Sequence, residues 1–112
     1  MLLAEAVPDF VAELSAALNA AGNPELGQEF AESTVSRFTY DPSSKACYIS
    51  LQPSRPLNVV ESNVIGAKHG RTLAIDHPFW VYVDVDNFNR PMGIELLNAS
   101  SILVQRLSAL TA

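Results

Sequence analysis

The sequence predicts an α+β fold with two N-terminal helices, a meandering antiparallel sheet of about five strands and a C-terminal helix. The apolar residues recur every three or four positions over residues 1–34 and mostly every second position afterwards. Helical spacing returns after Ser100 or Ser101, either of which can cap the last helix. We expect one domain over residues 1–112, in which an acidic helical extension precedes the sheet and the C-terminal helix (35–112).

The two N-terminal helices are bounded by residues that start and stop helices. Residues 3–21 carry apolar side chains at helical spacing, which should form one stripe that packs on the sheet: Val7, Phe10, Val11, Leu14 and Leu18. Gly22 should end this helix. Asn23 and Pro24 suit the N-cap and the first position of a second helix over residues 24–33.

Alternating apolar residues and turn chemistry predict the first strands. Val35–Tyr40 and Ala46–Leu51 flank Asp41–Lys45, whose composition is that of a turn, so the two strands should form a hairpin. Leu57–Ile65 is expected as a third strand. A polar loop is expected over Lys68–Arg71, and a short strand is expected over Thr72–Ile75.

Trp80–Asp86 has the clearest strand pattern in the chain. Three valines alternate with three polar residues, so one face should be apolar and the other polar: Val81, Val83 and Val85 against Tyr82, Asp84 and Asp86. Asn89 suits the left-handed conformation of the following turn, and Met92–Leu97 should be the partner strand. The register over residues 86–91 stays open, because a three-residue and a four-residue loop place Met92 on opposite faces.

Charge is distributed unevenly along the chain. The net charge is −5, and residues 1–34 hold no Lys or Arg but six carboxylates: Glu5, Asp9, Glu13, Glu25, Glu29 and Glu32. These residues are candidate contacts for a basic partner protein. We expect no nucleic-acid partner, because no phosphate-binding surface is evident, and no membrane partner, because no apolar run is long enough to span a bilayer. The single cysteine, Cys47, and the absence of a secretory signal favour the cytoplasm.

Two stretches of the sequence are familiar when taken together. The first is Tyr40-Asp41-Pro42 followed by Ala46, Tyr48-Ile49 and Leu51; the second is Val83-Asp84-Val85-Asp86, a turn, Gly93-Ile94-Glu95 and Leu97-Asn98-Ala99-Ser100. With these motifs, residues 36–101 resemble the small bacterial proteins of the domain of unknown function 2283 family. The resemblance implies a small sheet, is compatible with a homodimer, and brings no established activity and no catalytic residues.

Polar side chains on the second hairpin form a weak candidate site. Tyr82, Asp84 and Glu95 can gather on one side of the sheet, where two nearby carboxylates with different pKa values can perform acid–base chemistry. A solvated sheet face with ordinary cross-strand pairs is the alternative. Asp84, Asp86 and Glu95 also match positions of a calcium loop, but that loop needs oxygen ligands and a glycine where this sequence has other residues.

Other reactive side chains give weaker signals. His69 and His77 lack a third ligand for a metal, and Cys47 alternates with apolar residues as a buried side chain does. The segment His77–Trp80 is expected to be a packing anchor. The sequence therefore predicts no catalytic residue, no metal site and no cofactor.

The hypothesis that best accommodates these patterns is a non-enzymatic protein-interaction module, antitoxin-like or immunity-like, that masks a basic partner. One alternative is a small-molecule-binding protein or a small hydrolytic enzyme that uses the face of Tyr82, Asp84 and Glu95. Another is a structural domain that only self-associates. We also expect a homodimer, because the edges of a short sheet need cover.

Overall fold

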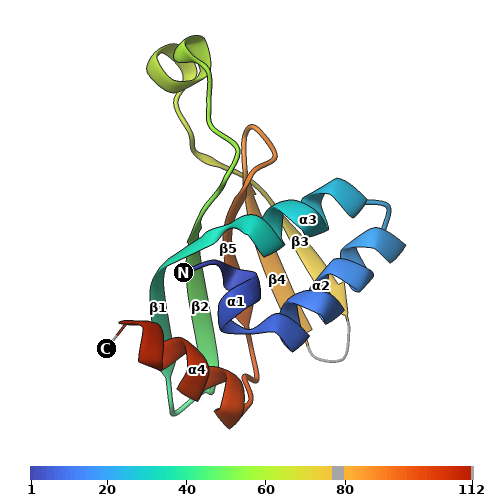
Figure 1. Cartoon of the computed structure of the whole chain (residues 1–112), viewed down its shortest axis with the longest axis vertical. Coiled ribbons are helices and arrows are strands. Elements are labelled where there is room, and N and C mark those ends of the chain that lie inside the picture. The colour runs from blue at the N-terminus through green and yellow to red at the C-terminus, as the bar shows by residue number, and fades with distance from the viewer. Residues whose placement is uncertain (77–79, 112) are drawn as a thin grey trace.

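The computed structural model of the chain describes residues 1–76 and 80–111, with the side chains of residues 76, 80 and 111 outside the description. His77 and the packing role of Trp80 therefore lie outside the described residues. The chain forms helices and a five-stranded antiparallel sheet, which confirms the α+β prediction (Figure 1). The strand order is β1-β2-β5-β4-β3, with bounds β1 Thr34–Asp41, β2 Ala46–Gln52, β3 His69–Asp76, β4 Trp80–Asp86 and β5 Pro91–Leu96.

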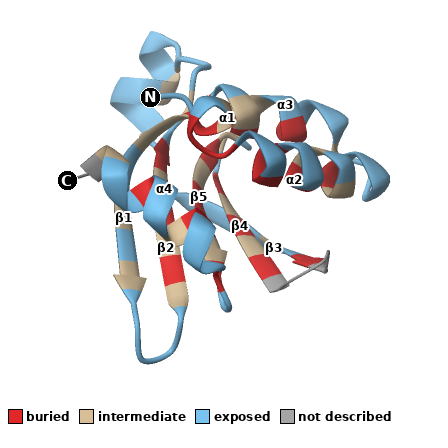
Figure 2. Cartoon of the chain, turned by 60° about the horizontal axis from the view of Figure 1, so that its bottom comes forward, coloured by how far each residue is buried: buried red, intermediate tan, exposed pale blue. Residues whose placement is uncertain are grey.

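The α-helices of the described residues lie on one face of the sheet (Figures 1 and 2), and their bounds are α1 Leu3–Ala6, α2 Pro8–Ala20, α3 Pro24–Glu32 and α4 Ser101–Thr111. We call this side the helix-bearing face and the opposite side the open face. Val81, Val83 and Val85 of β4 are 0–1% exposed on the helix-bearing face. The expected stripe of the N-terminal helices is buried against them in one apolar core, which is the packing expected of a sheet with one apolar side.

The expected helix over residues 3–21 is wrong in one detail, because the chain breaks it at Val7. The backbone of Val7 has φ −140° and ψ 68°, which is not helical. Pro8 begins α2 at its first position, where the missing N–H costs no hydrogen bond. Gly22, with φ 87°, follows the end of α2, and Pro24 begins α3 as expected.

The expected strand Leu57–Ile65 is wrong. Residues 53–68 instead form a projecting segment, called here the arm, which leaves the sheet after β2 and carries a short π-helix, η1 (Glu61–Ile65), before it returns to β3 (Figure 1). Asn58 and Glu61 cap one another: Glu61 N donates to Asn58 Oδ1 at 2.8 Å, and Asn58 N donates to Glu61 Oε1 at 3.0 Å. This exchange satisfies backbone groups locally, so the segment needs no strand partner.

The two hairpins follow the sequence more closely. β3 begins at His69, so the residues expected as a polar loop partly belong to a strand. Asn89 has φ 60°, the left-handed conformation expected of it. The open register is settled by a bulge: Asp84 faces Gly93 and Val85 faces Pro91, which leaves the intervening methionine without an opposite residue. Ser100 caps α4, since its Oγ accepts the Leu103 N–H at 3.2 Å.

Candidate functional site

The open face carries the three residues of the predicted polar face. Tyr82 on β4 lies directly opposite Glu95 on β5, and Asp84 lies two pairs further along, opposite Gly93. Because side chains alternate along a strand, all three lie on the side opposite to the buried valines. The fold thus brings Tyr82, Asp84 and Glu95 to one surface.

Asp84 is the centre of a hydrogen-bonded cluster on this face. Its Oδ2 accepts the hydroxyl of Tyr48 from β2 at 2.8 Å, and its Oδ1 accepts the hydroxyl of Thr72 from β3 at 2.5 Å. His69 Nε2 lies 3.0 Å from Thr72 Oγ1 and 3.5 Å from Asp84 Oδ1. Both carboxylate oxygens therefore already have donors from the chain itself.

Tyr48 is held in the protonated form. Burial raises the pKa of its hydroxyl above the usual range, and the hydrogen bond to Asp84 and the charges of Asp84 and Glu95 raise it further. The phenol ring lies over Gly93, where a methyl group would overlap it. Tyr48 therefore acts as a fixed donor on this face and not as a base.

Sequence reasoning missed Tyr48, Thr72 and His69 as members of the cluster. Tyr48 comes from β2 and reaches Asp84 across β5, between strands that do not follow one another in the chain, whereas Thr72 and His69 come from β3, which pairs directly with β4. Alternation within each strand indicates which side a residue takes, but not which strand lies beside it. The available signal was the alternation of Tyr48 with Cys47 and Ile49 in the first hairpin, which places Tyr48 on the side opposite to the apolar residues.

The open face offers a shallow surface for chemistry. A depression of about 340 Å³ beside the β1–β2 hairpin is lined partly by Thr39, Tyr48 and Glu95 and is open to solvent. Acid–base catalysis needs a group whose proton can leave, in a cleft that excludes water. Asp84, each of whose oxygens already accepts a hydroxyl group, and a phenol that stays protonated do not supply that combination. Asp86, the other acid of the calcium pattern, is turned into the β4–β5 turn and lies away from Asp84 and Glu95.

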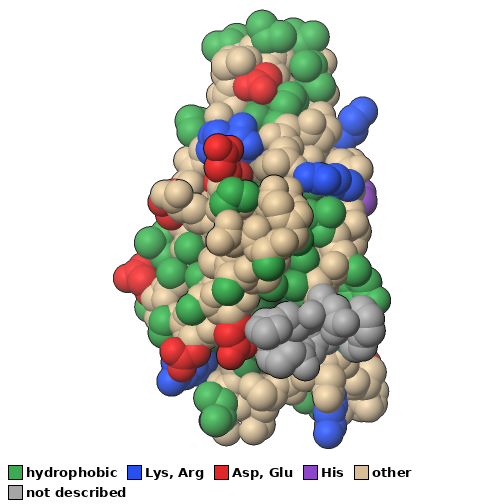
Figure 3. All heavy atoms as spheres, turned by 90° about the vertical axis from the view of Figure 1, so that its right-hand side faces the viewer, with side chains coloured by type: hydrophobic (Ala, Val, Ile, Leu, Met, Phe, Trp, Pro, Cys, Tyr) green, Lys and Arg blue, Asp and Glu red, His purple; other side chains and the backbone are tan. Residues whose placement is uncertain are grey.

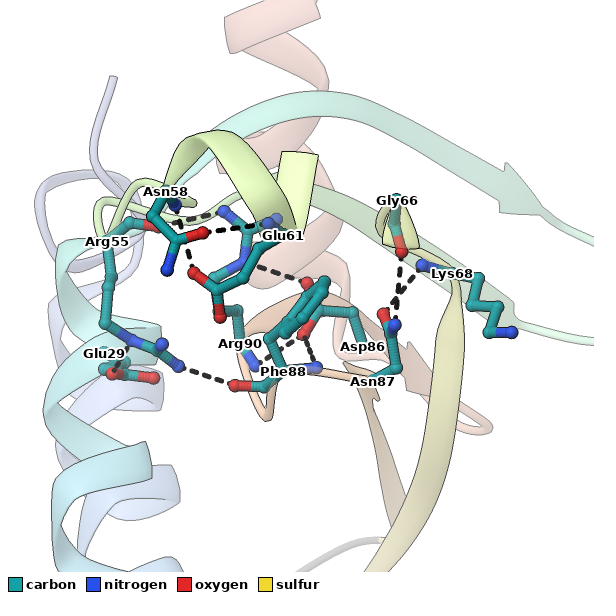
Figure 4. A network of polar contacts seen from close by, with 10 residues as sticks. All are labelled: Glu29, Arg55, Asn58, Glu61, Gly66, Lys68, Asp86, Asn87, Phe88 and Arg90. Carbon is teal, nitrogen blue, oxygen red and sulfur yellow. Dashed lines mark hydrogen bonds and ion pairs between the residues drawn. The ribbon is translucent and has the colours of Figure 1, made fainter. Parts of the chain in front are cut away.

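Asp86 anchors the β4–β5 turn from a buried position. Its Oδ1 accepts the backbone N–H groups of Phe88 at 2.9 Å and Arg90 at 2.8 Å, and its Oδ2 pairs with Arg90 Nε at 2.9 Å (Figure 4). The side chains of Asp86 and Arg90 are only 3% and 12% exposed. Burial of a charge is tolerated here because it is paired and fully hydrogen-bonded.

The same turn holds both ends of the arm (Figure 4). On the outgoing side, Arg90 Nη1 donates to the carbonyl of Arg55 at 2.9 Å, while Arg55 itself donates to the Phe88 carbonyl at 2.8 Å and pairs with Glu29 of α3 at 2.9 Å. On the returning side, Asn87 exchanges backbone and side-chain hydrogen bonds with Lys68 at 2.9 Å each. The base of the arm is therefore fixed to both the sheet and α3.

The tip of the arm is apolar and exposed. Four aliphatic side chains there are between 54% and 77% exposed: Val59, Val60, Val64 and Ile65. Hydrophobic side chains gather at the end of the arm in the space-filling view (Figure 3). We call these four residues the tip. A cluster of exposed aliphatic side chains such as this one is not expected on a surface that contacts only water. Sequence reasoning took the same residues for a strand, although Asn58 and Glu61 carried the spacing of a capping pair.

The acidic residues of the N-terminal helices do not form one continuous face. Five of the six are exposed as expected, and Glu29 is partly covered through its pair with Arg55. Glu5 accepts the N–H of Leu2 at the start of α1, and Glu32 accepts a hydrogen bond from Gln28. Asp9 and Glu13 instead border a groove of about 190 Å³ between α2 and α4. The six carboxylates therefore lie on several separate parts of the surface.

The comparison with protein families gives one match. A family model described as Protein of unknown function (DUF2283) matches residues 37–100, more than half of the chain. The chain belongs to the DUF2283 family. The DUF2283 match begins inside β1 and ends just before α4, so it contains the open-face cluster and the arm, whereas α1, α2 and α3 lie outside it. No curated protein and no solved structure matches the chain.

Proposed function

We propose that this DUF2283 protein is a non-enzymatic protein-interaction module whose main contact element is the tip of the arm. The observation that carries the proposal is the exposure of the four tip residues, each more than half exposed within one short segment. Single exposed aliphatic residues are normal on protein surfaces, but a cluster of them on a projection is typical of a surface that meets another protein.

The anchored base of the arm supports this function. Ordering a loose loop on binding costs conformational entropy, and a loop that is already held in place avoids that cost. The contacts of Arg55, Arg90 and Asn87 hold the arm before any partner arrives. The tip is thus presented in a defined position relative to the sheet.

A basic protein is the partner that suits the rest of the surface. The exposed carboxylates of α2 and α3, among them Asp9, Glu13 and Glu25, favour approach of a positively charged surface. An antitoxin-like or immunity-like protein, which covers a basic enzyme, is such a module. A hydrolytic function receives less support, because each oxygen of Asp84 already accepts a hydroxyl group, from Tyr48 or Thr72, on an open surface.

The test compares three variants of the tagged protein in its native lysate, after cross-linking and quantitative mass spectrometry. The tip variant changes all four tip residues to Ser. The acidic variant changes five N-terminal carboxylates to Gln and keeps Glu29, which holds Arg55 at the base of the arm. The matched control changes Leu97 and Ile102, two exposed apolar residues far from the arm, to Ser. Each variant should first show an unchanged circular dichroism spectrum, because none of the replaced side chains belongs to the core.

We expect the tip variant to lose the partner that the wild type and the control retain, and to bind the purified partner at least tenfold more weakly in calorimetry. If the acidic variant also loses the partner, the N-terminal helices contact the basic partner. Equal affinity of wild type and tip variant would refute the role of the arm. If the tip variant keeps the partner and differs from the wild type only in its oligomeric mass, self-association is the function of the arm.

A further inference from the structure

β1 is an edge strand whose register is regular from Arg37 to Asp41, after a bulge between Val35 and Arg37. β1 stands at one end of the strand order, and β2 occupies its inner side. Met1 and Leu2 cover the outer side only at its start, where Val35 N donates to Met1 O at 3.0 Å and Leu2 bridges Thr34. Beyond these contacts, no described strand pairs with the outer side of β1. Such an edge can accept another strand.

The side chains of this edge separate cleanly by face. Arg37, Thr39 and Asp41 pair with residues of the open face on β2, whereas Phe38 and Tyr40 pair with buried Ile49 and Cys47 on the helix-bearing face. Both aromatic side chains are only partly buried against the core, which leaves part of each ring available to a neighbour. The edge therefore presents a charged row on one face and an aromatic row on the other.

We propose that a second copy of this chain pairs antiparallel with β1 around a twofold axis through Thr39. In this register Arg37 of each copy lies opposite Asp41 of the other, and Phe38 of each lies opposite Tyr40 of the other. The sheets of the two copies then join into one, with the helices of both copies on the same side. The contact is isologous, so every favourable pair occurs twice.

Geometry restricts the choice of register. Opposite residues in an antiparallel pair share a face, so the axis of a symmetric pair must pass through a residue and not between two residues. An axis through Phe38 sets Arg37 opposite an uncharged threonine. An axis through Tyr40 sets Arg37 beyond the end of the strand. The register through Thr39 matches both charges and both aromatic rings.

The two charged groups are suited to this pairing. Arg37 is exposed and has no hydrogen bond or ion pair to any described residue. Asp41 is held by its own turn, where it accepts Ser43 N at 3.0 Å, Ser43 Oγ at 2.7 Å and Ser44 Oγ at 3.1 Å. These hydrogen bonds, first of all the one from the Ser43 side chain, lower the pKa of Asp41. The carboxylate is therefore fixed, ionised and available to a guanidinium group.

The opposite edge of the sheet does not match itself in this way. Each edge strand carries a bulge, β1 between Val35 and Arg37 and β3 between His69 and Arg71, so the bulges do not distinguish the two edges. An axis through Leu73 would place Arg71 opposite an isoleucine, and an axis through Ala74 would place Thr72 opposite an aspartate. The self-matching pattern is thus a property of β1, which favours a second copy over an unrelated strand as its occupant.

Charge reversal provides the first test. Sedimentation equilibrium should show a wild-type dimer, and Arg37→Asp and Asp41→Arg should each weaken dimerisation at least tenfold, because like charges then face each other twice. An equimolar mixture of the two variants should dimerise again, since every opposite pair is then attractive. This recovery also shows that both variants are folded. A wild-type protein that stays monomeric throughout the micromolar range, or single variants that dimerise like the wild type, would overturn the inference.

Disulfide trapping provides the second test, because it reports the register itself. The Thr39→Cys variant places two thiols on the axis, where paired Cα atoms lie about 4.5–5.5 Å apart, within the range of a disulfide. Mild oxidation should yield a covalent dimer on a non-reducing gel. Ser36→Cys is the matched control on the same strand, since in this register its two copies lie about 20 Å apart. Equal cross-linking of the two variants would contradict the proposed axis.

Discussion

Replacing Asp86 by Ala tests whether the buried β4–β5 turn holds the structure together. The change removes the acceptor of three hydrogen bonds, from Phe88 N, Arg90 N and Arg90 Nε. Arg90, 12% exposed, would keep only the carbonyl of Arg55. Removal of one member of a buried ion pair costs about 3–5 kcal/mol, and we expect the free energy of unfolding to fall by that amount. Urea denaturation followed by circular dichroism measures it.

Two further variants make this result interpretable. Asp86→Asn keeps an oxygen for the backbone donors but loses the charge facing Arg90, so we expect a smaller loss of about 1–3 kcal/mol. Glu5→Ala is the matched control, because Glu5 also accepts a backbone N–H, that of Leu2, but is exposed to solvent. If Asp86→Ala and Glu5→Ala destabilise the protein equally, burial of the pair contributes nothing and the reasoning is refuted.

The remaining predictions concern the sheet itself. Burial raises the pKa of the Cys47 thiol to about 11, so a thiol reagent at pH 8 should react only after unfolding, and rapid reaction with the folded protein would contradict the buried placement. This pKa of the folded protein lies above the ordinary value of 9.0, so the stability that the protonated thiol contributes is complete below about pH 9 and is lost as the pH rises toward 11. Denaturation at several pH values measures this loss. Gly93→Ala should cost about 1–3 kcal/mol by displacing the Tyr48 ring from Asp84, and clearly less in a Tyr48→Ala background, where no ring is left to displace.

The sequence allowed good prediction wherever local patterns decide the structure. The alternation around Val83 identified the buried side of β4, and Asn89 was correctly expected in the left-handed turn. The open-face cluster was only half foreseen, because Tyr48 reaches Asp84 through the pairing of β2 with β5 and of β5 with β4. Such contacts depend on strand order, which periodicity does not contain.

The arm was missed for a different reason. Val59, Val60, Val64 and Ile65 have high strand propensity, and propensity alone predicts that they are buried in a sheet. The structure gives them a capped helical turn and exposes them. The conflict between their apolar character and their position is itself informative, because such conflicts are expected mainly at functional surfaces.

The helices lie outside the segment that the DUF2283 model matches, which limits how that segment can fold by itself. The matched residues 37–100 contain nearly the whole sheet, yet the helices that cover its apolar side lie before and after them. A fragment cut to those limits would expose the buried side chains of β4 and β5 to water, such as Val83 and Ile94. In this protein the family motif is therefore an incomplete folding unit, and any sheet of the same pattern must obtain a cover from flanking sequence or from another chain.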